Sequence, residues 1–338
     1  VAMSLQKSVV VMAATMSMVW LVDSAEAQCA PDGDIQFLCG PVSPEDLVTI
    51  PESPWVIVSS MEDDGYLSLA DSRDHSSTVV FPTPESQPEH DLATFAQCPG
   101  MSTADFRPHG ISLQSGGDGV HTLFVVRHGS REAIEVFRVD ARTEVPRLTW
   151  VGCAVAPEAL GLNAVVGLPN GGFAATSPRT GDVWEWHSET GWSLVPGSEN
   201  IGPNGLEISR DGRWFYVAGY GSQSVIRLSR DLMPIRKDVV EVGFNVDNVH
   251  WASDGSLLAA GHSTPTRTRV GECMQQRICD GITSRVSAVN IQSLTAREIF
   301  AYPTNEYLLL GTAAIQVGAE IWVGGIAGGD RIARFPAP

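Results

Sequence analysis

The chain has few positive charges and none of several common catalytic or phosphate-binding motifs. Its 338 residues include 22 Lys and Arg against 39 Asp and Glu, a formal net charge of −17 at pH 7. Nucleic acids and anionic membrane surfaces bind clustered Lys and Arg, so neither is expected as the main partner. The sequence also has no GxSxG, HExxH, strand-linked GxGxxG or GxxxxGK motif, which argues against serine-esterase elbows, zinc-protease helices and phosphate-binding loops.

Long helical patterns are missing as well. No apolar repeat of 3.6 residues persists for a dozen residues beyond the N-terminal segment. Hydrophobic residues nevertheless make up 43% of the chain and charged residues 18%, which suffices for a globular core. The 33 Gly and 21 Pro are typical of a chain with many turns. These features favour an all-β protein, which at this length can be a single domain.

The N-terminal segment has the features of an export signal. Lys7 precedes an uncharged apolar stretch at residues 9–22, and residues 25–27 form a small-x-small cleavage pattern. The stretch is too short to span a bilayer as a helix, which needs about 20 residues. We therefore expect residues 1–27 to be a signal peptide and residues 28–338 to be the mature domain, secreted or periplasmic. An uncleaved anchor is the alternative.

The cysteine content fits the same compartment. Six cysteines in an exported chain indicate disulfides, because that compartment is oxidising. There is no CxxC pair, so a zinc site or a catalytic thiol has no local signature. The sequence does not fix the pairing, but proximity along the chain favours three bonds: Cys29 with Cys39, Cys98 with Cys153, and Cys273 with Cys279.

One pattern recurs six times: a short apolar strand, a turn with Gly or Ser, and an alternating strand. The repeats begin at Trp55, Thr122, Gly172, Trp214, Ser256 and Glu320. Several intervals match the length of a four-stranded propeller blade, roughly 40–50 residues. Asp-Gly and Asn-Gly turns ahead of some repeats favour hairpins. The sequence predicts an all-β, six-bladed β-propeller with a central metal-binding channel, closed by an N-terminal strand near residues 35–38.

Two segments interrupt the repeats. Residues 72–103 are polar and rich in Pro, and residues 264–283 contain the closely spaced Cys273 and Cys279. We expect both on a rim of the propeller, either as walls of a substrate entrance or as surface loops without a binding role.

Polar residues open the innermost strand of each predicted blade. They are Glu45 and Asp46, His109, Asn163, Asn204, Asp247 and Asn248, and Thr312. Innermost strands line the channel, so a position repeated in every blade converges on the axis. Five of these side chains supply oxygens that suit Ca²⁺ better than Mg²⁺ or a soft metal: Glu45, Asn163, Asn204, Asp247 and Asn248. One such residue alone would be an ordinary turn residue, but the repetition predicts a metal site.

Two histidines are expected beside this ring. His109 lies in PHGIS and His128 in VVRHG, at neighbouring strand ends of one predicted blade. Imidazole titrates near neutral pH, so the pair can take a proton from water and pass it outward. For either histidine alone, a structural hydrogen bond is the simpler interpretation. His262 is a candidate pocket wall, whereas His250 and the remaining histidines are expected in packing or at the surface.

Most of the predicted propeller resembles one known family. The resemblance lies in PEDLVTIPESPWVIVSS, FRPHGISL, LFVVRHGSREAIEVFRV, LNAVVGLPNGGFAAT, PNGLEISRDGRWFYVA, VDNVHWASDGSLLAAGH and GTAAIQVGAEIWVGG. In their order, and in the step from His109 to His128, these stretches are similar to serum paraoxonases, within the wider senescence-marker-protein and gluconolactonase-like propellers. The resemblance implies a Ca²⁺-dependent hydrolase of lactones and aryl esters, sometimes of phosphotriesters. It assigns the five oxygen donors to a catalytic calcium and the two histidines to a catalytic dyad.

The resemblance also implies a second, structural calcium, from which this chain departs. Asp46 and the backbone carbonyl of Ile111 would be ligands, but the expected Asp after Asn163 is Ala164. The family's acidic residue near the dyad is replaced around Ser177 in this chain.

The substrate pocket is expected to include four residues: His262, Met61, Gly202 and Ile326. Gly202 stands where the family has an aromatic side chain, so the pocket would be more open.

The sequence therefore predicts an enzyme in which calcium polarises a lactone or ester carbonyl while His109 activates water and His128 orients it. A small-molecule lactone or ester is the expected partner. Two alternatives stay open. The first is a non-catalytic propeller that binds a ligand or partner around a structural calcium. The second is a propeller with a different reaction, such as sugar-lactone or organophosphate hydrolysis or a condensation.

Overall fold

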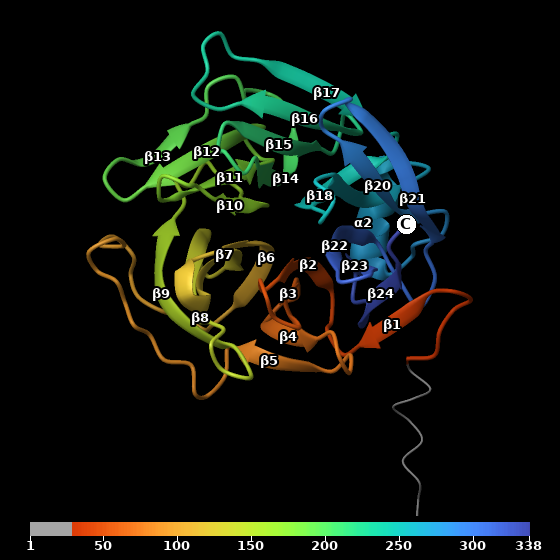
Figure 1. Ribbon diagram of the computed structural model, residues 1–338, viewed down its shortest axis with the longest axis horizontal. Coiled ribbons are helices and arrows are strands. Elements are labelled where there is room, and N and C mark those ends of the chain that lie inside the picture. Colours follow the sequence, from red (N-terminus) through yellow and green to blue (C-terminus); the bar gives the residue numbers. More distant parts are fainter. Residues whose placement is uncertain (1–28) are drawn as a thin grey trace, which may run out of the picture.

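The computed structural model describes residues 29–338, so the predicted signal peptide lies outside the described residues. Six four-stranded antiparallel sheets are arranged in a ring around a common axis (Figure 1). This confirms the predicted all-β, six-bladed propeller. Within the described residues, no helix is both long and apolar enough to cross a membrane.

The blades follow one another along the chain, and each begins with its innermost strand. Blade 1 contains β2 (Pro44–Thr49), β3 (Trp55–Ser60), β4 (Leu67–Asp71) and β5 (Ser77–Phe81). Blade 2 contains β6 (Phe106–Gln114), β7 (Val120–Gly129), β8 (Ala133–Asp140) and β9 (Arg147–Val155), with a 3₁₀ turn at Gly117–Gly119. Blade 3 contains β10 (Val165–Gly167), β11 (Phe173–Ser177), β12 (Asp182–His187) and β13 (Gly191–Leu194).

The other three blades have the same order. Blade 4 contains β14 (Pro203–Ile208), β15 (Trp214–Gly219), β16 (Ser224–Ser229) and β17 (Lys237–Glu241). Blade 5 contains β18 (Asn245–Trp251), β19 (Leu257–Ser263), the helix α2 (Arg267–Gln276), β20 (Thr283–Asn290) and β21 (Thr295–Pro303). Blade 6 contains β22 (Gly311–Val317), β23 (Glu320–Gly325), β24 (Arg331–Pro336) and, from the start of the chain, β1 (Gln36–Cys39).

The ring is closed by strands from both ends of the described chain. β1 pairs antiparallel with β24, with Gln36 opposite Arg334 and Cys39 opposite Arg331. The predicted N-terminal closing strand is therefore confirmed. Because β1 is the outermost strand of blade 6, the first and last strands hold each other in register. Each inner strand is an edge of its own sheet, and ring closure keeps these short edges facing the axis, where they are protected.

Alternating side chains join neighbouring blades. On β15, Phe215 and Val217 pack into the apolar cluster between blades 3 and 4, whereas Tyr216 and Ala218 pack into the cluster between blades 4 and 5. A strand directs successive side chains to opposite faces, so one strand serves two interfaces. Burying a side chain such as Phe215 stabilises the fold by about 1.5–3 kcal/mol. This packing fixes the inner strands around the channel.

The three favoured disulfides are all present: Cys29–Cys39, Cys98–Cys153 and Cys273–Cys279. Residues 29–338 contain no free cysteine. The second bond ties the connection after β5 to the outer strand β9, and the third joins Cys273, within α2, to Cys279, just after the helix. The cross-links thus hold the irregular segments rather than the blades themselves.

Both predicted insertions lie at one end of the propeller. The first is shorter than expected: β5 occupies Ser77–Phe81, so only residues 82–105 connect blade 1 to β6. The second connects β19 to β20. In these antiparallel blades, connections that enter an inner strand and connections between the second and third strands lie at the same end. That is the end where the inner strands begin.

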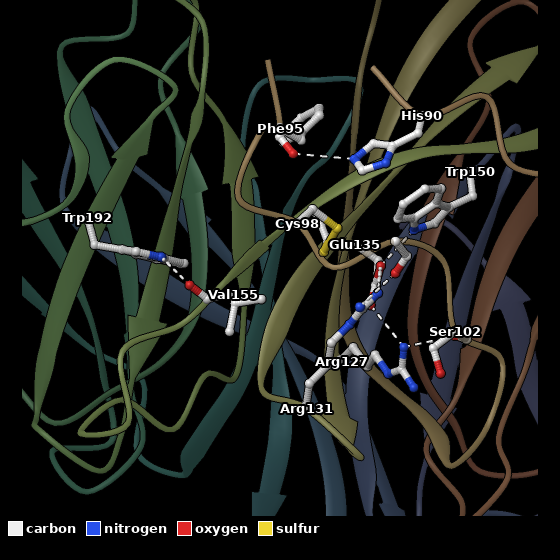
Figure 2. The surroundings of a disulfide bond; sticks show 12 residues. His90, Phe95, Cys98, Ser102, Arg127, Arg131, Glu135, Trp150, Val155 and Trp192 are labelled. Atoms are coloured by element: carbon white, nitrogen blue, oxygen red, sulfur yellow. Dashed lines mark hydrogen bonds and ion pairs between the residues drawn. A yellow bond between two sulfur atoms is a disulfide. The ribbon is translucent and has the colours of Figure 1, made fainter. Parts of the chain in front are cut away.

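A buried ionic cluster anchors the first insertion (Figure 2). Arg127, which is fully buried, donates to Glu135 over 3.1 Å and to the Ser102 carbonyl over 2.9 Å. Arg131 and the Trp150 indole also donate to Glu135, the latter over 2.7 Å. Charge-assisted hydrogen bonds of this kind are about twice as strong as neutral ones. The insertion is therefore a fixed part of the rim.

Candidate active site

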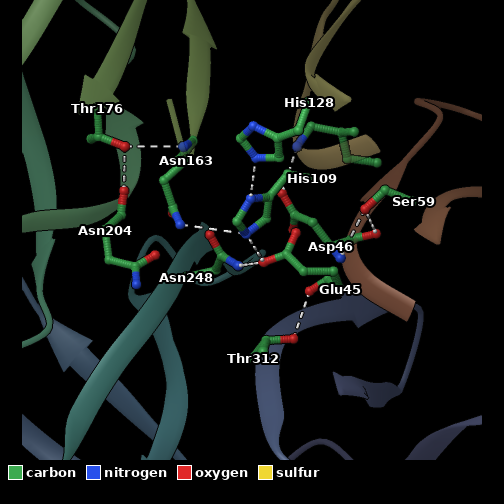
Figure 3. Close-up of polar contacts among 12 residues, drawn as sticks. Glu45, Asp46, Ser59, His109, His128, Asn163, Thr176, Asn204, Asn248 and Thr312 are labelled. Carbon is green, nitrogen blue, oxygen red and sulfur yellow. Dashed lines mark hydrogen bonds and ion pairs between the residues drawn. The ribbon is translucent and has the colours of Figure 1, made fainter. Parts of the chain in front are cut away.

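Polar side chains gather where the inner strands begin. Figure 3 shows a ring in which each member comes from a different blade: Glu45, His109, Asn163, Asn204 and Asn248. Asn248 donates from Nδ2 to Oε1 of Glu45 over 2.8 Å. The Thr312 hydroxyl donates to the backbone carbonyl of Glu45 over 2.7 Å. The Asn204 side chain acts to lower the pKa of the Asp247 carboxyl group, so the two side chains are near each other. The structure thus brings the predicted ring residues together at the channel.

β-Bulges aim these side chains into the channel. In blade 1 the pairing shifts between Pro44 and Asp46, which leaves Glu45 as the extra residue. Similar shifts fall at positions 108–111, 203–206, 246–248 and 311–313, and each encloses a residue of the predicted ring. A bulged residue leaves the hydrogen-bond ladder and its side chain is redirected. The ring is therefore built by one backbone irregularity repeated in five blades.

Glycines beside two of the bulges allow the blades to approach closely. A Cβ atom added to Gly110 would lie 2.5 Å from the carbonyl oxygen of Asn163. A Cβ atom on Gly205 would lie 2.5 Å from the carbonyl oxygen of Asp247. Any larger residue would push neighbouring inner strands apart. This explains the motifs His109-Gly110 and Asn204-Gly205 in physical terms.

Three oxygens of the ring are buried without a hydrogen-bond partner: Oε2 of Glu45 and the Oδ1 atoms of Asn163 and Asn204. Leaving a buried polar atom unsatisfied costs about 1–3 kcal/mol. Native structures keep few such atoms, and each calls for a reason such as ion binding. Uncharged and carboxylate oxygens are the ligands that Ca²⁺ prefers. The donor set therefore fits a hard divalent cation.

The charge of the ring supports the same interpretation. Burial, followed by the nearby Asp46 and Asp247, raises the pKa of Glu45 well above its usual value. Burial and Asp46 raise the pKa of Asp247 to about 7. A cation between them would offset this repulsion. Within residues 29–338, no group of three or more His, Cys, Asp or Glu side chains is arranged to hold a metal, so the fit depends on the asparagine oxygens.

The two predicted histidines form a hydrogen-bonded pair beside the ring. Nδ1 of His109 lies 2.9 Å from Nε2 of His128, and Nδ1 of His128 lies 2.8 Å from Oε2 of Glu132. Nε2 of His109 lies 3.6 Å from Oε1 of Glu45. Burial and the adjacent His128 lower the pKa of His109 to about 3. His109 is therefore uncharged at neutral pH.

The carboxylate of Glu132 determines where the protons lie. A carboxylate only accepts, so Nδ1 of His128 carries the proton of that hydrogen bond. In the uncharged dyad, Nε2 of His128 then accepts the Nδ1 proton of His109. This leaves a lone pair on Nε2 of His109, the nitrogen nearest the ring. The arrangement can remove a proton from a group bound at the ring.

Glu132 is a residue that the sequence analysis missed. The sequence analysis noted that the family's acidic residue is replaced around Ser177 and named no substitute. Glu132 supplies a carboxylate from the turn between β7 and β8. Its other oxygen, Oε1, accepts the backbone N–H of Leu162. The sequence signal that could have identified Glu132 is its position four residues after His128, in the turn that follows that strand.

Asp46 does not fit a second calcium. Its Oδ2 accepts the N–H of Ile111 over 2.8 Å, and its Oδ1 accepts the N–H of Leu47 over 2.8 Å. Ile111 therefore presents its N–H to Asp46. The family resemblance had implied that the carbonyl oxygen of Ile111 would be a calcium ligand. With Ala164 in place of the third expected ligand, the chain lacks the full ligand set that the resemblance implies for a second ion.

His250 supplies positive charge at this level of the channel. It was expected in packing or at the surface, and it is buried, with an exposure of 9%. The sequence did not predict its contact with Asp46, whose Oδ1 lies 2.7 Å from Nε2 of His250. Its Nδ1 lies 3.6 Å from Oε1 of Glu207. Burial opposes protonation, but the two carboxylates outweigh it and raise the pKa of His250 to about 10. A protonated imidazole thus lies between the two acids.

The predicted pocket residues have different settings. Met61 and Ile326 belong to an apolar cluster with Cys273 and Cys279, at the ring end of the channel. Gly202 has a positive φ of 62° in the turn before β14. His262 is 1% exposed and lies within β19. It is therefore buried within blade 5 and is not exposed on the surface of a pocket.

The opposite mouth of the channel contains a cavity of about 470 Å³. Its lining includes His250, Glu207, Gln114 and Gln316 from inner strands. His250 and Asp46 therefore lie between this cavity and the ring.

Comparisons with known proteins support the fold. No family model and no curated protein matches the chain. A gluconolactonase from Xanthomonas campestris superposes with a TM-score of 0.55 at 14% identity, covering 90% of this chain and 89% of its own. Regucalcin, a calcium-binding protein from Agrobacterium tumefaciens, gives a TM-score of 0.51 at 13% identity, covering 88% and 90%. An inactive variant of virginiamycin B lyase from Staphylococcus aureus gives 0.53 at 10%, covering 90% and 99%. At these identities the similarity shows a shared propeller fold and nothing more about this chain.

Proposed function

We propose that the chain is an exported, calcium-dependent hydrolase of lactones and aryl esters. The observation that carries the proposal is the hydrogen-bonded series Glu132–His128–His109, which ends at a nitrogen lone pair beside a ring of unsatisfied oxygens. A structural ion alone would not need an oriented base at its side. The three disulfides support export, because they are stable in an oxidising compartment.

The residues of the chain can carry the proton steps. Glu45, Asn163, Asn204, Asp247 and Asn248 would hold calcium, which when bound acts as a Lewis acid toward a carbonyl oxygen. Nε2 of His109 removes the proton of the attacking water. The Nδ1 proton of His109 is already shared with His128, whose own Nδ1 proton faces Glu132. The charge that forms on the dyad is thereby spread toward a carboxylate.

The fold comparisons support lactones as the first substrates to test. The gluconolactonase and the calcium-binding regucalcin have the same fold over most of both chains. The lyase has this fold as well, so the fold alone permits other reactions.

The test is a panel of γ- and δ-lactones, aryl esters and one phosphotriester, assayed with Ca²⁺ and with EDTA. We expect lactone and aryl-ester hydrolysis that EDTA abolishes and added Ca²⁺ restores. His109→Gln should lower kcat by about 10²–10⁴-fold and leave calcium binding intact, whereas His187→Gln, on an outer strand, should change neither. Activity that persists without calcium would contradict the mechanism. Calcium binding without hydrolysis of any member would favour a non-catalytic propeller.

A further inference from the structure

The cavity at the opposite mouth of the channel has no role in the proposed mechanism. Its volume of about 470 Å³ lies in the range of small-molecule sites, about 300–1,000 Å³. All six inner strands, which surround the axis in Figure 1, contribute to its lining. His250 lines the cavity and its Nε2 faces Asp46, so this pair separates the cavity from the ring. A molecule bound in the cavity would therefore not share the site at the ring.

The walls of the cavity are polar even where their side chains are apolar. Each inner strand pairs with only one neighbouring strand, so its other backbone edge faces the axis. Alternate N–H and C=O groups on such an edge have no partner within the sheet. Because unpaired backbone groups away from water cost free energy, this cavity favours a ligand with many hydrogen-bonding groups over an apolar one.

Two side chains add hydrogen-bond acceptors from different blades. Nε2 of Gln114, on β6, donates to the carbonyl oxygen of Leu168 over 2.9 Å, which fixes the orientation of the amide. Its Oε1 has no donor among residues 29–338. On β14, Oε2 of Glu207 accepts the N–H of Ile208, and Oε1 is the second acceptor. Both side chains line the cavity.

His250, on β18, supplies a donor. Asp46 and Glu207 each lie next to one of its ring nitrogens, so both nitrogens carry protons. Nδ1 lies 3.6 Å from Oε1 of Glu207, which is beyond hydrogen-bond range. One hydroxyl group can fill this gap, because it accepts from an N–H group and donates to a carboxylate. A carboxylate only accepts and an ammonium group only donates, so neither can do both.

The formal charges around the cavity balance. Asp46 and Glu207 are acidic, whereas His250 and Arg210, which also lines the cavity, are basic. Burying an ion without a counter-ion costs more free energy than burying a neutral polar group that finds partners. A neutral ligand therefore fits this cavity better than an amine or a carboxylate.

We propose that the cavity is a second binding site, which takes a small neutral polyhydroxylated molecule such as a monosaccharide or a cyclic polyol. One hydroxyl group of the ligand lies between Nδ1 of His250 and Oε1 of Glu207, and another donates to Oε1 of Gln114. The remaining hydroxyl groups pair with the free edges of the inner strands. Binding at this site requires no cation at the ring.

The test is calorimetric titration of the full chain with myo-inositol and with glucose, once with Ca²⁺ and once with EDTA. We expect dissociation constants in the millimolar range or below, equal in the two buffers. Glucosamine and glucuronate carry one charge on a sugar of similar size, and both should bind about tenfold more weakly than glucose.

Two substitutions place the ligand in this cavity. Glu207→Gln replaces a charged acceptor with an amide of similar size and should weaken binding by about tenfold or more, whereas Glu241→Gln, exposed on the outer strand β17, should not. Thr49→Trp puts a large side chain at an exposed lining position and should abolish binding. Thr295→Trp, exposed on the outer strand β21, is its control. Melting temperatures identify any variant that fails to fold.

Three results would overturn the proposal. The first is no binding of either neutral probe, and the second is tighter binding of a charged sugar. The third is binding that survives Thr49→Trp or that is lost with EDTA while the chain stays folded, since the sugar would then lie elsewhere. The proposed hydrolase is tested by calcium and by substitutions at the ring, so its failure would leave this second site unaffected.

Discussion

Glu45 and Asp46 are neighbours in the sequence and carry the same charged group, yet their surroundings differ. Oε2 of Glu45 is buried with no hydrogen-bond partner. The oxygens of Asp46 accept two backbone N–H groups and face His250. Because successive residues of a strand point in different directions, the bulge at Glu45 separates two levels of the channel. The oxygens of one level fit an external cation, and the other level has a cationic side chain of its own.

The largest effect should follow removal of the external cation. EDTA should abolish hydrolysis and destabilise the wild-type fold, because a ligand at 1,000 times its Kd contributes about 4 kcal/mol. Glu45→Ala should remove calcium binding, so EDTA should no longer shift its melting temperature. Calorimetric titration with Ca²⁺ and thermal unfolding with and without EDTA check both points. One bound ion per chain is expected. If EDTA changed neither the activity nor the melting temperature of the wild-type protein, the ring at Glu45 would not be a cation site.

The level of Asp46 should respond to a different change. His250→Gln leaves Asp46 and Glu207 without their positive partner, and breaking a buried charged pair costs about 3–5 kcal/mol. Denaturant unfolding measures this loss, and His187→Gln, on an outer strand, is the control. The calcium response of the ring should persist. If the variant bound one more calcium per chain than wild type, the Asp46 level would also be able to hold a metal.

The parts predictable from sequence are those that repeat. Six strand patterns with Asp-Gly and Asn-Gly turns predict six blades, and polar residues at one slot predict the ring. The chain closure was also predictable, because three strands at the C-terminus left one place for β1. Glu132 and His250 do not belong to a repeated pattern, since their contacts with Leu162 and Asp46 form only when distant parts of the chain fold together. The short strand β5 was missed because STVVF lies in a polar segment.

The smallest expected effect concerns the outer end of the dyad. Glu132→Gln replaces an acceptor-only carboxylate with an amide that can donate to Nδ1 of His128, which would reverse the proton positions in both imidazoles. Since Glu132 touches His128 and not the ring, it is a positioning residue, and we expect kcat to fall about ten- to hundredfold with KM nearly unchanged. Glu132→Asp should recover part of the loss, and the exposed Glu158→Gln, in the connection before Asn163, should have no effect. If KM rose as much as kcat fell, or if the response to calcium were lost, Glu132 would instead support the shape of the whole site. Orientation of the base by Glu132 and cation binding by the ring would then not be separate functions.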